Sequence, residues 1–146
     1  MTVAKEKKDF IARMFQSAAF VQDLGIELVD TGEGWCETML HIAPRHQQQN
    51  GYIHAGVSAT IADHTAGGAA MSLTAEGFGV LSIEFKINLL RPAIGERLRC
   101  RATVLKPGRA ISFVEAEVFS VSSQERLVAK ASVTLAIVPW VAPSSR

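Results

Sequence analysis

The sequence predicts an α+β protein in which a strongly curved antiparallel sheet surrounds one apolar helix. Residues Ala55–Leu73 are rich in Ala, which favours a helix, and in small side chains that let neighbouring elements pack close to the helix backbone. After Gly77 the hydrophobic period changes to two, which is typical of strands with one apolar face. We therefore expect a sheet covered on one side only, with the helix of Ala55–Leu73 on its concave face.

The chain before this helix contains a further helix and a strand pair. Apolar residues recur at intervals of three and four over Phe10–Leu24, which predicts one amphipathic helix. Ile26–Asp30 and Trp35–Ile42 are expected to be strands joined by the turn-forming residues 31–34 (Thr-Gly-Glu-Gly). Ala43–Gly51 is polar and contains a proline and an Asn-Gly pair, so we expect a loop.

Long strands follow the apolar helix. Their expected ranges are Gly79–Leu90, Leu98–Val104, Ile111–Val121 and Leu127–Ile137. Simple alternation in the first strand places Ser82 on a polar face together with Glu84, Lys86 and Asn88. No repeat or linker divides the chain, so we expect a single domain over residues 1–146 with an extended tail from Pro139 to Arg146.

Composition excludes several function classes. With 15 basic and 14 acidic residues, the chain has no electrostatic footprint for nucleic acid or an anionic membrane. The most apolar stretch, Ile53–Leu73, contains His54 and Asp63, which a membrane span of ~20 residues rarely carries. Cys36 and Cys100 form no CxxC motif, and the N-terminus has no apolar signal segment. We expect a cytoplasmic protein with two reduced thiols.

Local motifs of common enzyme classes are absent. The sequence has no GxSxG, no P-loop and no GxGxxG motif, so it offers no local support for a serine hydrolase, a nucleoside triphosphatase or a dinucleotide-binding enzyme. The four histidines lack the close spacing of metal ligands, so we expect no metal site. They are His41, His46, His54 and His64.

The informative segment joins a polar loop to the apolar helix. The first amides of a helix have no internal partners, so the N–H groups of Ala55 and Gly56 can polarise a carbonyl oxygen. Asp63 lies among apolar neighbours, where a carboxylate is either hydrogen-bonded as a structural acid or opens onto a cleft.

Helix geometry separates these two features. Nine residues from His54 to Asp63 turn a helix through about 900° and rise about 13 Å, so the Ala55 amide and the Asp63 carboxylate cannot meet around one small carbonyl. Two antiparallel copies of the helix bring them together, which predicts a shared site in a homodimer.

This segment resembles the PaaI-like branch of the hotdog-fold thioesterases. The resemblance runs from about His46 through Gly95, in QNGYIHAGVSATIAD followed by SIEFKINLLRPAIGERL. The family pattern Gly-x-x-His-(Gly or Ala)-Gly with a later acid falls on Gly51, His54, Ala55, Gly56 and Asp63. The resemblance implies the hotdog fold, a long helix wrapped by an antiparallel sheet, assembled as a homodimer and often as a homotetramer. It also implies hydrolysis of acyl-CoA thioesters without a metal or organic cofactor, since coenzyme A is part of the substrate.

The resemblance also implies roles for single residues. Asp63 is the general base that activates water, or the nucleophile, and the Ala55 N–H polarises the thioester carbonyl from the other chain. Ser82 helps to place the water. An Asn or Gln usually lies six residues before the histidine, where this chain has Gln48, while Asn50 lies two residues further on.

Other residues are candidates for substrate binding. We interpret His54 as a residue that orients the loop beside the substrate. The remaining candidates are Asn50, Gly51 and Gly56 in the motif and, for the CoA phosphates, Lys86, Arg91 and Arg109. The acyl group expected is small, medium or aromatic.

Two alternatives remain open on the sequence. The same fold can serve as a non-catalytic acyl-CoA-binding module. It can also serve as an enoyl-thioester hydratase or dehydratase, in which a histidine is paired with a carboxylate; the one close pair in the sequence is Asp63–His64.

Overall fold

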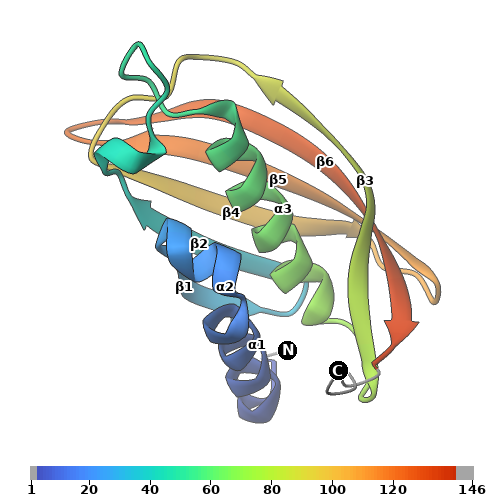
Figure 1. Cartoon of the computed structure of the whole chain (residues 1–146). Coiled ribbons are helices and arrows are strands. Elements are labelled where there is room, and N and C mark those ends of the chain that lie inside the picture. The colour runs from blue at the N-terminus through green and yellow to red at the C-terminus, as the bar shows by residue number, and fades with distance from the viewer. Residues whose placement is uncertain (1–2, 141–146) are drawn as a thin grey trace, which may run out of the picture.

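The structure, a computed structural model, describes residues 3–140 as one curved sheet around a central helix (Figure 1). All strand pairs are antiparallel, in the order β1-β2-β4-β5-β6-β3. The α+β prediction, with the helix on the concave face, is confirmed. In chain order the elements are α1 (Lys5–Ser17), α2 (Ala19–Leu24), β1 (Ile26–Gly32), β2 (Trp35–His41), the 3-10 helix η1 (Pro44–His46), α3 (Ala55–Met71), β3 (Phe78–Leu89), β4 (Arg97–Lys106), β5 (Ile111–Val121) and β6 (Glu125–Pro139).

The N-terminal helical region is broken, whereas the sequence predicted one helix over Phe10–Leu24. Ala18 adopts an extended conformation between α1 and α2, with φ −81° and ψ 92°. Phe15 and Val21 are both buried, at 3% and 4% exposure. Six residues apart on one straight helix, they would point about 120° apart, so the break lets both reach the core.

The small residues of α3 have two different surroundings. A Cβ on Gly68 would lie 2.7 Å from the Sγ of Cys36 and 3.2 Å from the Phe15 ring, so no larger residue fits there. This confirms the expected close packing on the side of β2 and α1. A Cβ on Gly67 would meet nothing within 4 Å. One face of α3, which includes Gly67, is therefore not covered by other residues of the described chain.

The two cysteines are buried as free thiols inside the sheet. Both Cys36 and Cys100 are 0% exposed, and burial raises the pKa of each thiol to about 12. They are therefore protonated packing residues rather than nucleophiles.

A β-bulge at Ile83 in β3 changes which face its side chains occupy. Ser82 pairs with Leu135, whereas Glu84 pairs with the neighbouring Thr134, so Ile83 has no partner on β6. Residues directly opposite each other share a face of the sheet, and Leu135 is 1% exposed on the helix side. Ser82 therefore faces α3 while Glu84 faces outward. The prediction that they share a polar face is wrong, because simple alternation does not include a bulge.

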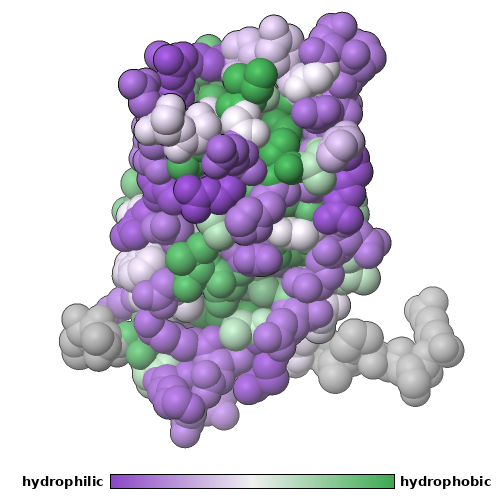
Figure 2. Space-filling model, turned by 90° about the vertical axis from the view of Figure 1, so that its left-hand side faces the viewer, coloured by the Kyte–Doolittle hydropathy of each residue, from purple (hydrophilic) through white to green (hydrophobic). Residues whose placement is uncertain are grey.

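The surface combines hydrophilic regions with apolar patches, as one face in Figure 2 shows. The most concentrated exposed apolar set lies on β3, which is an edge of the sheet. It consists of Phe78 (39% exposed), Leu81 (63%), Ile83 (58%), Phe85 (43%) and Leu89 (55%). A long apolar edge strand favours pairing with another chain.

At the chain end, the Trp140 ring packs edge-on against Phe10, with ring centroids 6.4 Å apart. The remainder of the expected tail, residues 141–146, lies outside the described residues. No helix within residues 3–140 has both the length and the apolar character needed to cross a membrane.

Candidate active site

The loop before α3 is held by a buried histidine. His46 is 1% exposed, and its Nδ1 accepts a hydrogen bond of 2.9 Å from the Ala43 N–H. Its Nε2 lies 2.7 Å from the carbonyl oxygen of Leu24, so the ring proton is on Nε2 and is donated to Leu24. This structural role of His46 is not predictable from the sequence, because sequence spacing indicates neither partner.

A tight turn separates the two candidate amide residues. The Gly51 N–H donates to the Gln48 carbonyl at 3.0 Å, and Gly51 has a φ of +83°, which favours glycine. The Asn50 N–H donates to the Gln48 side-chain oxygen. Gln48 lines the cavity described below, whereas Asn50 is exposed in the turn and is not among the residues lining that cavity. Of the two candidate amide residues, only Gln48 therefore lies at the cavity.

The start of α3 presents one free amide. His54 is the N-cap residue, and its Nδ1 accepts a hydrogen bond of 2.9 Å from the Gly56 N–H. The prediction that the Gly56 N–H also polarises a carbonyl oxygen is therefore wrong for this structure, because that N–H already donates to His54. No hydrogen bond to the Ala55 N–H occurs within residues 3–140.

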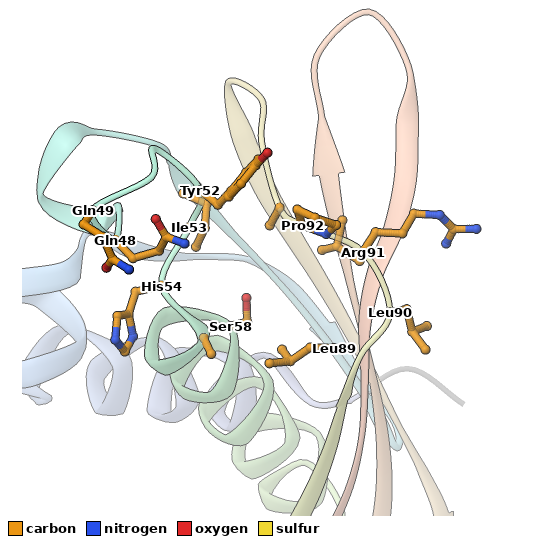
Figure 3. A pocket seen from close by; sticks show the side chains of 13 residues that line it. Gln48, Gln49, Tyr52, Ile53, His54, Ser58, Leu89, Leu90, Arg91 and Pro92 are labelled. Atoms are coloured by element: carbon orange, nitrogen blue, oxygen red, sulfur yellow. The ribbon is translucent and has the colours of Figure 1, made fainter.

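Ala55 lines a cavity of about 530 Å³ (Figure 3). In Figure 3, Gln48 and Gln49 from the loop lie on one side, and Leu89 to Pro92 lie on the other, with Leu89 beside the start of α3. The lining residues are Gln48, Gln49, Tyr52, Ile53, His54, Ala55, Ser58, Leu89, Leu90, Arg91, Pro92, Ala93 and Val128. Asp63 is not one of them, as the helix geometry predicts for a single chain.

A second cavity of about 350 Å³ adjoins the first. The two share Arg91, Pro92 and Val128, and the second is also lined by Arg126 and by residues 122–124 of the β5–β6 hairpin. Arg126 was not among the residues predicted from the sequence, because only the sheet brings this hairpin beside the end of β3.

The other two basic candidates lie elsewhere in the chain. Lys86 pairs with the exposed Ser132 on the convex face of the sheet. Arg109 lies in the β4–β5 hairpin, next to the Ala110 carbonyl that accepts a hydrogen bond from the Ile137 N–H near the end of β6. The structure brings only Arg91 of the three predicted residues to the cavity.

Asp63 and Ser82 meet between α3 and β3. The Ser82 hydroxyl donates a hydrogen bond of 2.6 Å to Oδ1 of Asp63. Asp63 is half-buried, and its Oδ2 has no hydrogen bond within residues 3–140. The carboxylate is therefore held by a strand side chain and keeps one oxygen free, which differs from a structural acid bonded to backbone amides.

His64 is directed away from Asp63. Its ring packs edge-on against Phe15, with centroids 4.4 Å apart, and its Nε2 is buried without a hydrogen-bond partner within the described chain. Burial lowers the pKa of His64, although the nearby Asp63 charge opposes this. The two side chains do not form the histidine–carboxylate pair that a hydratase requires.

Among residues 3–140, no group of three or more His, Cys, Asp or Glu side chains is arranged to hold a metal ion.

Comparison with known proteins finds similar sequences and structures among thioesterases. The chain is similar in structure to a thioesterase family protein from Silicibacter pomeroyi, with 34% identity, a TM-score of 0.87, and coverage of 89% of this chain and 96% of the other. It is 26% identical over 118 residues to human acyl-coenzyme A thioesterase 13, covering 80% of this chain and 84% of that protein. The fold also matches the Escherichia coli PaaI protein from the phenylacetic acid degradation operon, with a TM-score of 0.81, 21% identity, and coverage of 91% and 94%.

Fold and relatives together define a thioester hydrolase with the hotdog fold. Residues 50–127 match the model of the thioesterase superfamily. The chain belongs to this superfamily, which confirms the resemblance seen in its sequence.

Proposed function

We propose that this enzyme hydrolyses acyl-CoA thioesters at sites shared between the two subunits of a homodimer. The observation that carries the proposal is that Ala55 lines the cavity, whereas Asp63 of the same chain, which is held by Ser82, does not. Two similar proteins have names consistent with this substrate class, human acyl-coenzyme A thioesterase 13 and a 1,4-dihydroxy-2-naphthoyl-CoA hydrolase of Listeria monocytogenes.

The spacing along α3 requires a second chain. Eight residues separate Ala55 from Asp63, which corresponds to a rise of about 12 Å. A partner helix running antiparallel to α3 would bring its own Asp63 toward the Ala55 amide, and the two-fold axis would create two identical sites.

Two features of the surface support such a dimer. β3 is an unpaired edge with exposed Leu81, Ile83 and Leu89, so pairing with a second β3 would continue the sheet and cover these side chains. On α3, Gly67 lies one turn beyond Asp63 and faces open space, which would let a partner helix approach closely. Pairing of dimers into a tetramer stays a prediction.

The chemical step follows from the hydrogen bonds. The Ala55 N–H donates to the thioester carbonyl oxygen, and the Oδ2 atom of the partner subunit's Asp63 removes a proton from water as the water oxygen bonds to the carbonyl carbon. The carbon–sulfur bond then breaks, and the CoA thiolate takes back the proton. Ser82 donates to Oδ1 of Asp63 and thereby orients the carboxylate, while its own oxygen can accept a hydrogen bond from the water.

Asp63 can also act as the nucleophile. Its carboxylate then attacks the carbonyl carbon, the thiolate leaves, and water hydrolyses the resulting anhydride. A single turnover in ¹⁸O-water separates the two routes, because only the second route places ¹⁸O in Asp63 when water attacks the aspartyl carbon of the anhydride.

The two adjoining cavities support coenzyme A as the carrier of the acyl group. The arm of the thioester would lie between Gln48 and Leu90, and the phosphates would reach Arg91 and Arg126 in the adjoining cavity. Phosphate is bound well by arginine guanidinium groups, because they donate several hydrogen bonds in a fixed plane. The reaction as proposed uses no metal or organic cofactor.

The test measures the hydrolysis of a panel of acyl-CoA esters, whose acyl groups range from short aliphatic to aromatic. Release of free thiol reports the reaction. We expect turnover with the native protein and a loss of about 10²–10⁴-fold in kcat for Asp63→Asn. Glu76→Gln, an exposed acid beyond the end of α3, is the control. Saturable binding without thiol release would instead indicate an acyl-CoA-binding module.

A further inference from the structure

Ser58 is a buried hydroxyl directed into the cavity at the start of α3. It is 3% exposed and is one of the residues lining that cavity. Figure 3 shows its oxygen pointing from the helix toward the space between the loop and the end of β3. No hydrogen bond to this hydroxyl occurs within residues 3–140.

The free hydroxyl is unusual in this protein. Other serine and threonine hydroxyls in or directly after its helices donate to a backbone carbonyl three or four residues earlier. These are Ser17 to Met14 (3.0 Å), Thr60 to Gly56 (2.7 Å), Thr65 to Ile61 (2.5 Å) and Ser72 to Ala69 (2.7 Å). Ser58 does not make this bond, and its oxygen faces the cavity instead. Its orientation therefore leaves a donor available to a ligand.

The position of Ser58 on the helix determines what it can reach. It lies three residues after Ala55, so the two share one helix face, and helical side chains lean toward the N-terminus. The Ser58 hydroxyl thus lies on the same side of the cavity as the free Ala55 N–H.

We propose that Ser58 donates a second hydrogen bond to the thioester carbonyl oxygen, beside the Ala55 N–H. As the oxygen of water bonds to the carbonyl carbon, negative charge moves onto this oxygen, and two donors in a buried site stabilise it more than one. When the carbon–sulfur bond breaks, the charge leaves with the thiolate and both hydrogen bonds weaken. This inference rests on the proposed thioesterase reaction at the same site.

Steady-state kinetics of Ser58→Ala test the proposal. Because the donor acts on charge that develops during the reaction, we expect kcat to fall about 10²-fold while KM changes little. Ser17→Ala removes a hydroxyl already bonded within α1 and should retain native kinetics. Unchanged kcat, or an effect on KM alone, would overturn the role. Failure of the thioesterase proposal would look different, because the native protein itself would then show no turnover.

Infrared spectroscopy supplies a readout that altered stability does not mimic. A ¹³C-carbonyl acyl-CoA bound to Asp63→Asn should turn over slowly enough for its carbonyl stretch to be measured. Removing Ser58 as well should raise that frequency, because one hydrogen bond to the carbonyl is lost. An identical frequency in the single and double variants, both saturated with ligand, would contradict the proposed contact.

Discussion

The Ser82 hydroxyl and the Asp63 carboxylate are joined by a hydrogen bond of 2.6 Å that links β3 to α3. The bond exists because the bulge at Ile83 places Ser82 on the helix side of the sheet. Without the bulge, Ser82 would face the side occupied by Glu84, and the helix would carry an unpartnered carboxylate. A local irregularity in the strand thus orients the acid that the proposed reaction needs.

Replacing Ser82 with Ala should therefore lower kcat by about 10- to 150-fold, because a hydrogen bond to a charged group is worth about 1.5–3 kcal/mol. Stopped-flow or thiol-release kinetics measure the effect. Ser132→Ala, on the convex face of β6, is the matched control. Equal loss in both variants would show that the effect comes from the sheet and not from Asp63.

Complementation tests whether each site uses two chains. Ala55→Pro removes the free N–H, and proline is well accepted at the first helical position, where His54 already has the extended conformation required before it (φ −62°, ψ 137°). Alone, Ala55→Pro and Asp63→Asn should both be nearly inactive. Refolded together at equal amounts, they should recover about a quarter of native activity, since half of the dimers are mixed and each has one intact site. No recovery, despite mixed dimers, would place both groups in one chain.

The exposed edge of β3 should hold the dimer together. Introducing charge with Leu81→Lys and Ile83→Lys should give a monomer with native far-UV circular dichroism and little activity. Light scattering after size-exclusion chromatography measures the mass. Leu105→Lys is the control, because Leu105 on β4 is 62% exposed and Leu81 is 63% exposed. A double variant that stays dimeric would rule out this interface.

Arg126 should recognise the phosphates of coenzyme A. We expect Arg126→Gln to raise KM for an acyl-CoA by about 10-fold at low salt, and by less at high salt because ions screen exposed charges. The same acyl group on pantetheine, which lacks the phosphates, should show no change. Lys86→Gln, on the convex face, serves as the comparison and should keep the native KM. An equal effect on the KM of both substrates would show that Arg126 does not bind the phosphates.

His64 should make the fold sensitive to acid. Burial beside Phe15 lowers its pKa in the folded state, whereas in the unfolded chain the imidazole binds a proton near its ordinary pKa of about 6.5. Below about pH 6.5, the unfolded state therefore binds more protons than the folded state. The free energy of unfolding then decreases as the pH falls, until the pH is below the lowered pKa of His64 in the folded state. When the pH is lowered from 7.5 to 5.5, the Tm of His64→Leu should decrease by a few degrees less than the Tm of the native protein. Parallel curves for the two proteins would contradict this.

Much of the fold can be predicted from the sequence because the patterns that indicate it are local. The Ala-rich run predicted α3, and alternation predicted the four long strands, whose ends differ only slightly from those observed. The motif around His54 placed the free amide at Ala55, because the first N–H of any helix lacks an internal partner. The break at Ala18 was not predictable, since it results from the need of Phe15 and Val21 to reach one core.

The sequence by itself determined the class of fold and the chemical groups of the candidate site, since helix periodicity, strand alternation and the motif all act over a few neighbouring residues. Only the tertiary structure decided which groups meet. The bulge turned Ser82 toward Asp63, the cap by His54 occupied the amide of Gly56, and the sheet brought Arg126 beside Arg91. These contacts depend on register and on hairpins distant in sequence, and no local pattern specifies either.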